Sequence, residues 1–481
     1  MSLKTKTING LVWSFLDNFV VQGVNFVTGI ILARILSPRE FGLVGMVTIF
    51  IALGQSFADS GFTQALIRKK KCTQTDYSTV FFFNVLVGIA WYFLLLVSAG
   101  SIAGFFSQPE LVRIVPVLGL GVVVNAFSII QTTQLTKRID FKLQTRVSAV
   151  SSVLAGIIAV VLALRGFGVW SLVVLTLAKS ILNTLFLWLW NDWKPSLVFD
   201  RSSFKELFGF GSKLLLVGLI DTTYRNIYLA VIGKFFSAAD LGFYTRADQF
   251  KQLPSKNLTT VIQRVSYPVL SSIRGDVSVL KAAYKKLIKS TMLISFVLMI
   301  GLAAVAEPMV MTLIGEKWLI SAEYLQLLCF GGMLYPLQAL NLNMLNVQGR
   351  SDLFLRLEII KKALAVPIII VGINYGIKVM IIAMIFNSLI SYYLNSYWSG
   401  RLIGYSMLEQ VSDILPSFML AFAVGLAVFF TGHLIAASPI ITLAVQILVG
   451  ALLTIGLAEL IHLDSYIYMK RTVLDKIRRK S

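Results

Sequence analysis

The sequence predicts an all-α protein that crosses a lipid bilayer many times, and three observations carry this prediction. Of its 481 residues, 57% are hydrophobic and only 14% are charged, whereas a soluble domain carries about 25% charged residues. The mean hydropathy is +0.80. Apolar stretches of about 20 residues, the length that crosses the hydrocarbon core as a helix, recur along the whole chain. Together these observations exclude a soluble enzyme and a secreted disulfide scaffold.

Taken in order, the apolar stretches predict fourteen membrane helices. They are 9–36, 41–66, 77–104, 111–135, 146–165, 168–190, 207–234, 242–272, 287–307, 322–348, 355–374, 377–398, 412–433 and 439–463. No small-residue cleavage site follows the first, so we expect it to be retained and not removed as a signal peptide. The eighth segment is the least apolar of the fourteen. It is assigned as a span only because of the spans on either side of it.

The net charge of +20 is explained mainly by topology. In a soluble protein such a charge would suggest binding to nucleic acid, but the cytoplasmic loops of membrane proteins are rich in Lys and Arg. With the N-terminus in the cytoplasm, 29 of the 43 basic residues fall on the cytoplasmic side and 7 on the opposite side. We therefore expect both termini in the cytoplasm and no nucleic-acid partner.

An internal repeat relates the two halves of the chain. The segment Arg34–Gly42 matches Lys234–Gly242, shifted by 200 residues, and in each copy a Ser precedes an acidic residue that opens the next helix. Six spans separate the copies, so both halves insert with the same orientation. This predicts an N-lobe (1–192), a cytoplasmic linker (193–206), a C-lobe (207–400), and two further helices with a basic tail (401–481). Substrate is expected between such lobes near the bilayer midplane, with access alternating as the lobes rock.

The sequence contains no motif typical of metal, thiol or nucleotide chemistry. The chain has two cysteines, Cys72 and Cys329, and two histidines, His433 and His462, at spacings that fit no metal site. It has no Walker A sequence, so ATP is not expected to drive the protein directly. We expect no cofactor, no metal and no catalytic residues.

Six short segments, at turns and helix ends, form a distinctive set: Lys4–Ser14, Leu32–Leu43, Asp59–Phe62, Leu66–Lys70, Arg264–Ser271 and Ile314–Trp318. In this order they resemble segments of Wzx-type polysaccharide flippases. The resemblance is to the polysaccharide transporter branch of the multidrug/oligosaccharidyl-lipid/polysaccharide (MOP) superfamily, which includes the MATE transporters, and within it to the exopolysaccharide, colanic-acid-like subgroup. It implies two six-helix lobes plus two C-terminal helices.

The same resemblance implies a function. Such a protein flips undecaprenyl-diphosphate-linked oligosaccharide repeat units across the bacterial inner membrane for exopolysaccharide, capsule or O-antigen (lipopolysaccharide) synthesis. A polysaccharide polymerase and export machinery are the implied partners. We expect a monomer surrounded by membrane lipids.

The eighth span carries the strongest candidate site. A diphosphate and a polar glycan need a hydrated, cationic path, and charges inside spans are costly and usually functional. At 100° per residue, one stripe of this span holds Arg246, Gln249, Lys256, Asn257, Thr260, Gln263, Arg264 and Tyr267. Arg246 and Arg264 could alternatively snorkel to the two interfaces, but Lys256 lies too near the middle. We predict that Arg246, Lys251, Lys256, Asn257 and Arg264 contact the substrate, with arginine suited to phosphate.

The seventh span adds a second group of polar residues. Asp221 and Arg225 are four residues apart, so they can pair on one helix face. In one interpretation, the pair only neutralises itself so that the helix can insert into the membrane. In the other, Arg225 and Tyr224 contact the substrate, and Asp221 takes part in ion coupling.

Three more acidic residues are candidates for ion coupling. They are Asp17, Asp59 and Asp248. Asp17 and Asp59 have no acidic counterpart in the second copy of the repeat, so the lobes differ chemically. Asp59 precedes Ser60-Gly61 and could instead be an ordinary helix-end residue.

Two other functions remain as alternatives. An ion-coupled drug exporter of the same superfamily would favour an acidic path, but bases outnumber acids inside these spans. A membrane glycan polymerase or ligase would carry a large periplasmic loop, and no such loop is predicted.

Overall fold

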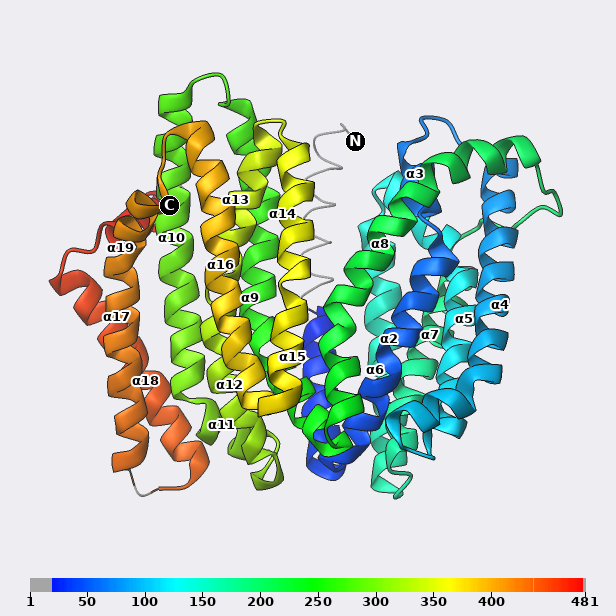
Figure 1. The fold of residues 1–481 in the computed structure, drawn as a ribbon, viewed down its shortest axis with the longest axis horizontal. Helices are drawn as coiled ribbons and strands as arrows, with labels where there is room; N and C mark the ends of the chain where they lie inside the picture. The colour runs from blue at the N-terminus through cyan, green and yellow to red at the C-terminus, as the bar shows by residue number, and fades with distance from the viewer. Residues whose placement is uncertain (1–19, 436, 479–481) are drawn as a thin grey trace. The chain divides into compact units, whose positions relative to one another are not determined.

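The computed structural model describes residues 20–435 and 437–478, which form α-helices joined by short connections and one 3-10 turn (Figure 1). Ten of the described helices are long and apolar enough to cross a membrane. The all-α prediction is confirmed, and the chain is a multi-pass membrane protein. Asp17 and the start of the first predicted span lie outside the described residues, of which Val20–Ile35 form a shorter apolar helix.

Packing divides the chain into two compact units, which meet in sequence between Gly242 and Phe243. The first unit contains α2 (Pro38–Asp59), α3 (Phe62–Arg68), α4 (Gln74–Phe106), α5 (Leu111–Arg138), α6 (Phe141–Leu164), α7 (Val169–Trp190) and α8 (Arg201–Phe235). The predicted lobes, 1–192 and 207–400, were defined by the sequence repeat, whereas these two units are defined by packing. The lobe boundaries therefore stay a prediction.

The second unit begins inside α9 (Ala238–Ser272). It continues with α10 (Val277–Ala304), α11 (Ala306–Leu313), the 3-10 turn η1 (Glu316–Trp318), α12 (Leu319–Gly332), α13 (Tyr335–Val347), α14 (Ser351–Ala363), α15 (Ala365–Tyr375), α16 (Ile377–Ile403), α17 (Met407–Leu434), α18 (Pro439–Leu460) and α19 (Asp464–Arg478). Helix α10 packs against α12, α13 and α17. Its buried aromatic residues Tyr284 and Phe296 belong to the core of this unit.

Three of the predicted spans are not single, uniformly apolar helices in the structure. The eighth corresponds to α9, which is one helix of 35 residues with Pro254 and Pro268 inside it. The tenth and eleventh are each broken into two shorter helices, α12 with α13 and α14 with α15. Proline lies close to the break between α12 and α13, at Pro336, and a missing amide donor makes such an interruption easier.

The second predicted span is also broken, between α2 and α3. Ser60 and Gly61 have positive φ angles of 48° and 72°, which turns the chain sharply before α3 begins. A side chain at Gly61 would overlap the carbonyl oxygen of Gly211 in α8. Glycine is therefore required here both by the backbone conformation and by the close approach of α8.

The helix starts predicted from the repeat are confirmed. The backbone amide of Ser37 donates to Glu40 at 2.6 Å, and that of Ser237 donates to Asp240 at 3.2 Å. A Cβ atom at Gly42 would overlap the carbonyl oxygen of Ala238, and one at Gly242 would overlap that of Pro38. The two copies of the repeat therefore cross reciprocally, each glycine against the start of the other helix.

Helices α3, α4 and α8 are joined by an ionic cluster at one end of the first unit. Lys69 donates to Glu206 at 2.8 Å and to Asp76 at 3.1 Å. The hydrogen bond to Glu206 makes the largest contribution to raising the pKa of Lys69 above its ordinary value, and Asp76 acts in the same direction. The beginning of α8 is thereby held against the first unit.

Candidate substrate-binding face

Helix α9 has one packed face and one exposed polar face. On the packed face, Ser321 of α12 donates to the carbonyl oxygen of Phe243, and Asn343 of α13 donates to Ser266, each at 3.0 Å. The exposed face contains five of the eight residues predicted to form the polar stripe: Gln249, Lys256, Gln263, Arg264 and Tyr267. Asn257 and Thr260 are half-buried at its edge. The stripe predicted from helical periodicity therefore faces away from the core of the second unit.

Lys256 has a distinctive position on this face. It is exposed near the middle of a helix of membrane length. Its ammonium group has no hydrogen bond or ion pair with any residue that the structure describes. A charge in this position is too costly to face lipid, so its surroundings must be hydrated or anionic when it works.

Arg246 differs from the rest of the predicted stripe. It is 9% exposed, its guanidinium donates to Gln249 at 2.7 Å, and it lies 6.0 Å from the centre of the Trp318 ring. This aromatic neighbour is 72 residues away in sequence, so no local spacing pointed to it. The contact holds Arg246 against η1.

Lys251 and Asp248 form an ion pair with each other. Their side chains are 18% and 21% exposed, and Asp248 also accepts a hydrogen bond from Gln252. Together the two side chains carry no net charge. Each therefore already has a charged partner, Lys251 where a substrate contact was predicted and Asp248 where ion coupling was predicted.

The Asp221–Arg225 pair on α8 is confirmed. The Arg225 Nε atom donates to the Asp221 carboxylate at 2.7 Å, and the two side chains are 64% and 40% exposed, respectively. Tyr224 is half-buried beside them. Thr222 shares a hydrogen bond of 3.1 Å with Ser56 of α2, which fixes this part of α8 within the first unit.

Asp59 lies at the break between α2 and α3. Its carboxylate accepts hydrogen bonds from the hydroxyl and the backbone amide of Thr63, and the Thr63 hydroxyl lies 3.2 Å from that of Thr133 in α5. No basic side chain pairs with Asp59 in the described part of the chain. Asp59 is thus both a helix-end residue, as one alternative held, and a partly buried carboxylate without a countercharge. The two threonines were not identified from the sequence, because only the fold brings α5 to this break.

A metal centre is not assembled from these residues. Within residues 20–435 and 437–478, no three His, Cys, Asp or Glu side chains lie close enough to hold a metal ion. Asp59, Asp221 and Asp248 lie in separate environments, each with its own hydrogen-bond donors.

Comparison with known proteins identifies a family model described as polysaccharide biosynthesis protein, which matches residues 31–323. Among similar proteins, the lipopolysaccharide biosynthesis protein WzxC of Escherichia coli is 25% identical, over 89% of each chain. The teichuronic acid biosynthesis protein TuaB of Bacillus subtilis is 27% identical, over 73% of each chain. The succinoglycan biosynthesis transport protein ExoT of Rhizobium meliloti is 27% identical, over 70% of this chain and 68% of its own.

Solved structures show the same fold. The lipid II flippase MurJ, in an inward closed conformation, superimposes with a TM-score of 0.74 over 95% of this chain and 99% of its own, at 14% identity. A MATE multidrug transporter of the MOP superfamily, in an inward-facing conformation, gives a TM-score of 0.62 over 79% of this chain and 94% of its own, at 17% identity. The predicted MOP-type fold is confirmed.

Proposed function

The chain belongs to the family of polysaccharide biosynthesis proteins, and we propose that within it the chain acts as a flippase. Its cargo is an undecaprenyl-diphosphate-linked oligosaccharide repeat unit, which it moves across the bacterial inner membrane by alternating access. The similarity to WzxC, TuaB and ExoT supports this assignment, and the fold is compatible with it. The protein works as a transporter and not as an enzyme.

The observation that carries the proposal is Lys256, which is exposed on the polar face of α9 and pairs with none of the residues that the structure describes. An ammonium group at this depth needs an anionic or hydrated partner, and a diphosphate supplies both charge and bound water. Arg264, exposed on the same face, adds a guanidinium that can bind phosphate oxygens with two parallel hydrogen bonds. Asn257 at the edge of the face supplies an amide for sugar hydroxyls.

The remaining predicted residues take supporting roles. Arg225 and Tyr224 contact the cargo from α8, with Asp221 orienting the arginine through their hydrogen bond. Arg246 and Lys251 are held by Gln249 and Asp248, so they shape the basic side of α9. Asp59 is the leading candidate for ion coupling, because it is a partly buried acid at the break inside the second predicted span and has no basic partner in the described chain.

The sign of the charges favours this cargo over that of a drug exporter. The MATE fold alone does not separate the two functions, because both occur on related architectures. The exposed charges of α9 are basic, and a cationic drug would be repelled by them. We therefore retain the lipid-linked oligosaccharide as the cargo.

Replacing Lys256 by alanine tests the proposal directly. We expect Lys256→Ala and Arg264→Ala to reduce polysaccharide export at least tenfold in a strain deleted for this gene, while the protein remains in the membrane. Lys256→Arg should retain activity, because it keeps the charge. Exported polysaccharide and membrane-bound protein are measured in the same cells.

Arg274→Ala is the matched control for these variants. Arg274 is an exposed base just beyond the end of α9, outside the proposed face, so its loss should leave export unchanged. Wild-type export by both Lys256→Ala and Arg264→Ala would refute the assignment of this face.

A further inference from the structure

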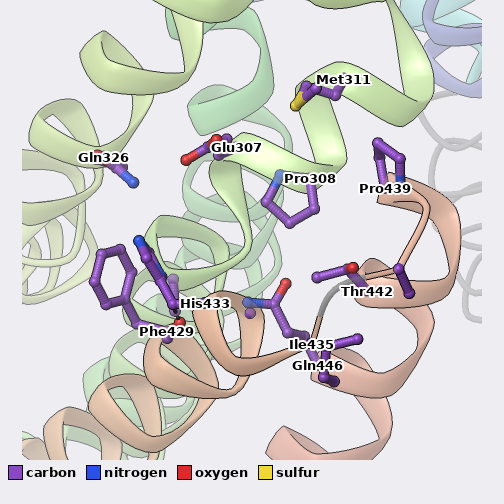
Figure 2. A pocket seen from close by; sticks show the side chains of 13 residues that line it. Glu307, Pro308, Met311, Gln326, Phe429, His433, Ile435, Pro439, Thr442 and Gln446 are labelled. Atoms are coloured by element: carbon purple, nitrogen blue, oxygen red, sulfur yellow. Dashed lines mark hydrogen bonds between the residues drawn. The ribbon is translucent and has the colours of Figure 1, made fainter.

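A pocket of about 240 Å³ lies in the second unit, where α10, α11, α12, α17 and α18 meet (Figure 2). It contains none of the residues assigned to the proposed substrate-binding face. Its polar lining residues come from four different helices: Glu307, Gln326, His433, Thr442 and Gln446. The volume equals that of about eight liquid waters, which is below the range of about 300–1,000 Å³ for drug-sized ligands.

Glu307 places a carboxylate at this pocket. It is exposed in the first turn of α11, where the helix dipole favours an acid. No residue in the described chain forms a hydrogen bond or an ion pair with its carboxylate. The dipole explains why an acid is tolerated there, but it leaves the carboxylate oxygens open to a ligand.

His433 presents a second acceptor. Its Nδ1 atom lies 3.1 Å from the carbonyl oxygen of Phe429. A carbonyl can only accept, so Nδ1 carries a proton, and in the neutral form of the ring Nε2 then has a free lone pair. The Phe429 ring lies 4.5 Å from the imidazole, centre to centre, and Figure 2 shows both rings at the same side of the pocket.

Gln446 adds a third acceptor at the buried side of the pocket. It is 2% exposed, and its amide nitrogen donates to the carbonyl oxygen of Val428 at 2.9 Å. Its Oε1 atom is buried without any hydrogen-bond donor in the described chain. Such an oxygen costs about 1–3 kcal/mol if it stays unsatisfied, so a small movement of the pocket wall that admits a donor to it is favoured.

We propose that this pocket binds a primary ammonium group, the head group of a zwitterionic phospholipid such as phosphatidylethanolamine. A carboxylate, an imidazole lone pair and an amide oxygen all accept hydrogen bonds, and an aromatic ring attracts a cation. An ammonium group has three N–H donors, one for each of these acceptors. A quaternary ammonium keeps the charge but has no N–H to donate.

The surroundings of the pocket favour a lipid as the source of the ammonium. Leu434, Ile440 and Ile441 directly adjoin its lining residues in sequence and are 84%, 62% and 53% exposed. These apolar side chains lie at the ends of two helices long enough to span the membrane, where acyl chains can cover them. The pocket is too small for an oligosaccharide but large enough for a head group.

Lipid binding to the purified full-length protein tests this inference. Native mass spectrometry would follow titration with phosphatidylethanolamine, its N-methyl and N,N-dimethyl derivatives, phosphatidylcholine and phosphatidylglycerol. We expect affinity to fall stepwise with each N–H replaced, so that phosphatidylethanolamine binds at least tenfold more tightly than phosphatidylcholine or phosphatidylglycerol. Equal affinity for phosphatidylethanolamine and phosphatidylcholine would overturn the proposal.

Two variants and one control locate the binding. Glu307→Gln removes the charge and His433→Phe removes the acceptor while keeping a ring, and each should lower the affinity for phosphatidylethanolamine at least fivefold. Glu316→Gln, an exposed acid in η1 outside the pocket, should change nothing. Melting temperatures in phosphatidylglycerol verify that each variant is folded. Wild-type affinity in a folded Glu307→Gln or His433→Phe variant would contradict the assignment.

A competition experiment separates a lipid from a free amine. Millimolar ethanolamine should leave bound phosphatidylethanolamine in place, because it lacks the acyl chains. Displacement by ethanolamine, with the same dependence on Glu307, would overturn the lipid source. None of these outcomes depends on whether the chain exports polysaccharide, so the inference and the flippase proposal can fail separately.

Discussion

At the scale of single residues, Lys137 shows how a charge inside a membrane protein can serve structure. Its ammonium group donates to the carbonyl oxygens of Leu66, at 2.7 Å, and of Lys69, and it lies 2.8 Å from the sulfur of Cys72. Carbonyls at the end of a helix lack donors within that helix, and α3 ends at Arg68. A cation from α5 therefore completes the end of α3.

Removing this cation should destabilise the first unit. We expect Lys137→Met to cost about 1–3 kcal/mol, because it leaves buried acceptors without a donor, and to lower the melting temperature of the detergent-purified protein. Lys71→Met, at an exposed base nearby, serves as the control and should melt like the wild type. Identical melting of the two variants would contradict the capping role.

Asp59 allows a separate test at the same scale. Asn keeps an oxygen that can accept from Thr63 but cannot lose or bind a proton. We expect Asp59→Asn to preserve folding and to abolish the response of flipping to an imposed proton or sodium gradient, measured in proteoliposomes. A gradient response like that of the wild type would assign coupling elsewhere, with Asp221→Asn as the next variant to examine.

At the scale of elements, the break between α2 and α3 depends on glycine. Gly61 has φ at 72°, and the neighbouring Gly211 of α8 is so close that its own Cβ would lie 2.9 Å from the Ser60 carbonyl oxygen. We expect Gly61→Ala to cost more than about 2 kcal/mol, since a left-handed alanine costs about 1–2 kcal/mol before the steric overlap is counted. The melting temperature is again the measurement.

Gly100→Ala is the matched control for that prediction. Gly100 lies inside α4, and no atom lies within 4 Å of the position its Cβ would take. Alanine favours a helix over glycine by up to about 1 kcal/mol, so this variant should melt at or above the wild-type temperature. A fall as large as that for Gly61→Ala would mean that the break imposes no special constraint.

At the scale of the whole molecule, the distribution of basic residues predicts how the chain inserts. Ser438, between α17 and α18, is expected outside the cell membrane, and Gly275, between α9 and α10, is expected in the cytoplasm. In a background without Cys72 and Cys329, a membrane-impermeant maleimide should label Ser438→Cys in intact cells and Gly275→Cys only after permeabilisation. The reverse pattern would invert the proposed topology.

Much of the fold could be predicted because it follows from local rules. The apolar lengths, the Ser-to-acid helix starts at Ser37 and Ser237, and the Asp221–Arg225 pair all depend on residues within a few positions of one another. The breaks inside the tenth and eleventh spans were not predicted, because hydropathy averages over a helix and does not register a local interruption.

The environment of the polar residues could be predicted only in part. Periodicity placed Arg246 and Lys256 on one stripe of α9, yet Arg246 is buried beside Trp318 while Lys256 is exposed. The pocket at Glu307 and His433 was not predicted at all, since its lining residues come from two stretches of the chain, 304–326 and 429–446, that only folding brings together.

The amino-acid sequence alone is enough to predict a helical membrane protein with an internal repeat and an excess of bases in its polar spans. Those properties are set by composition and by spacing along the chain, which need no tertiary contact. Which charges are paired, which are buried and which acceptors share a pocket depends mainly on contacts between residues that are far apart in the sequence. The reason is physical: the cost of a charge or an unpaired acceptor depends on what surrounds it, and most of those neighbours are brought there by folding.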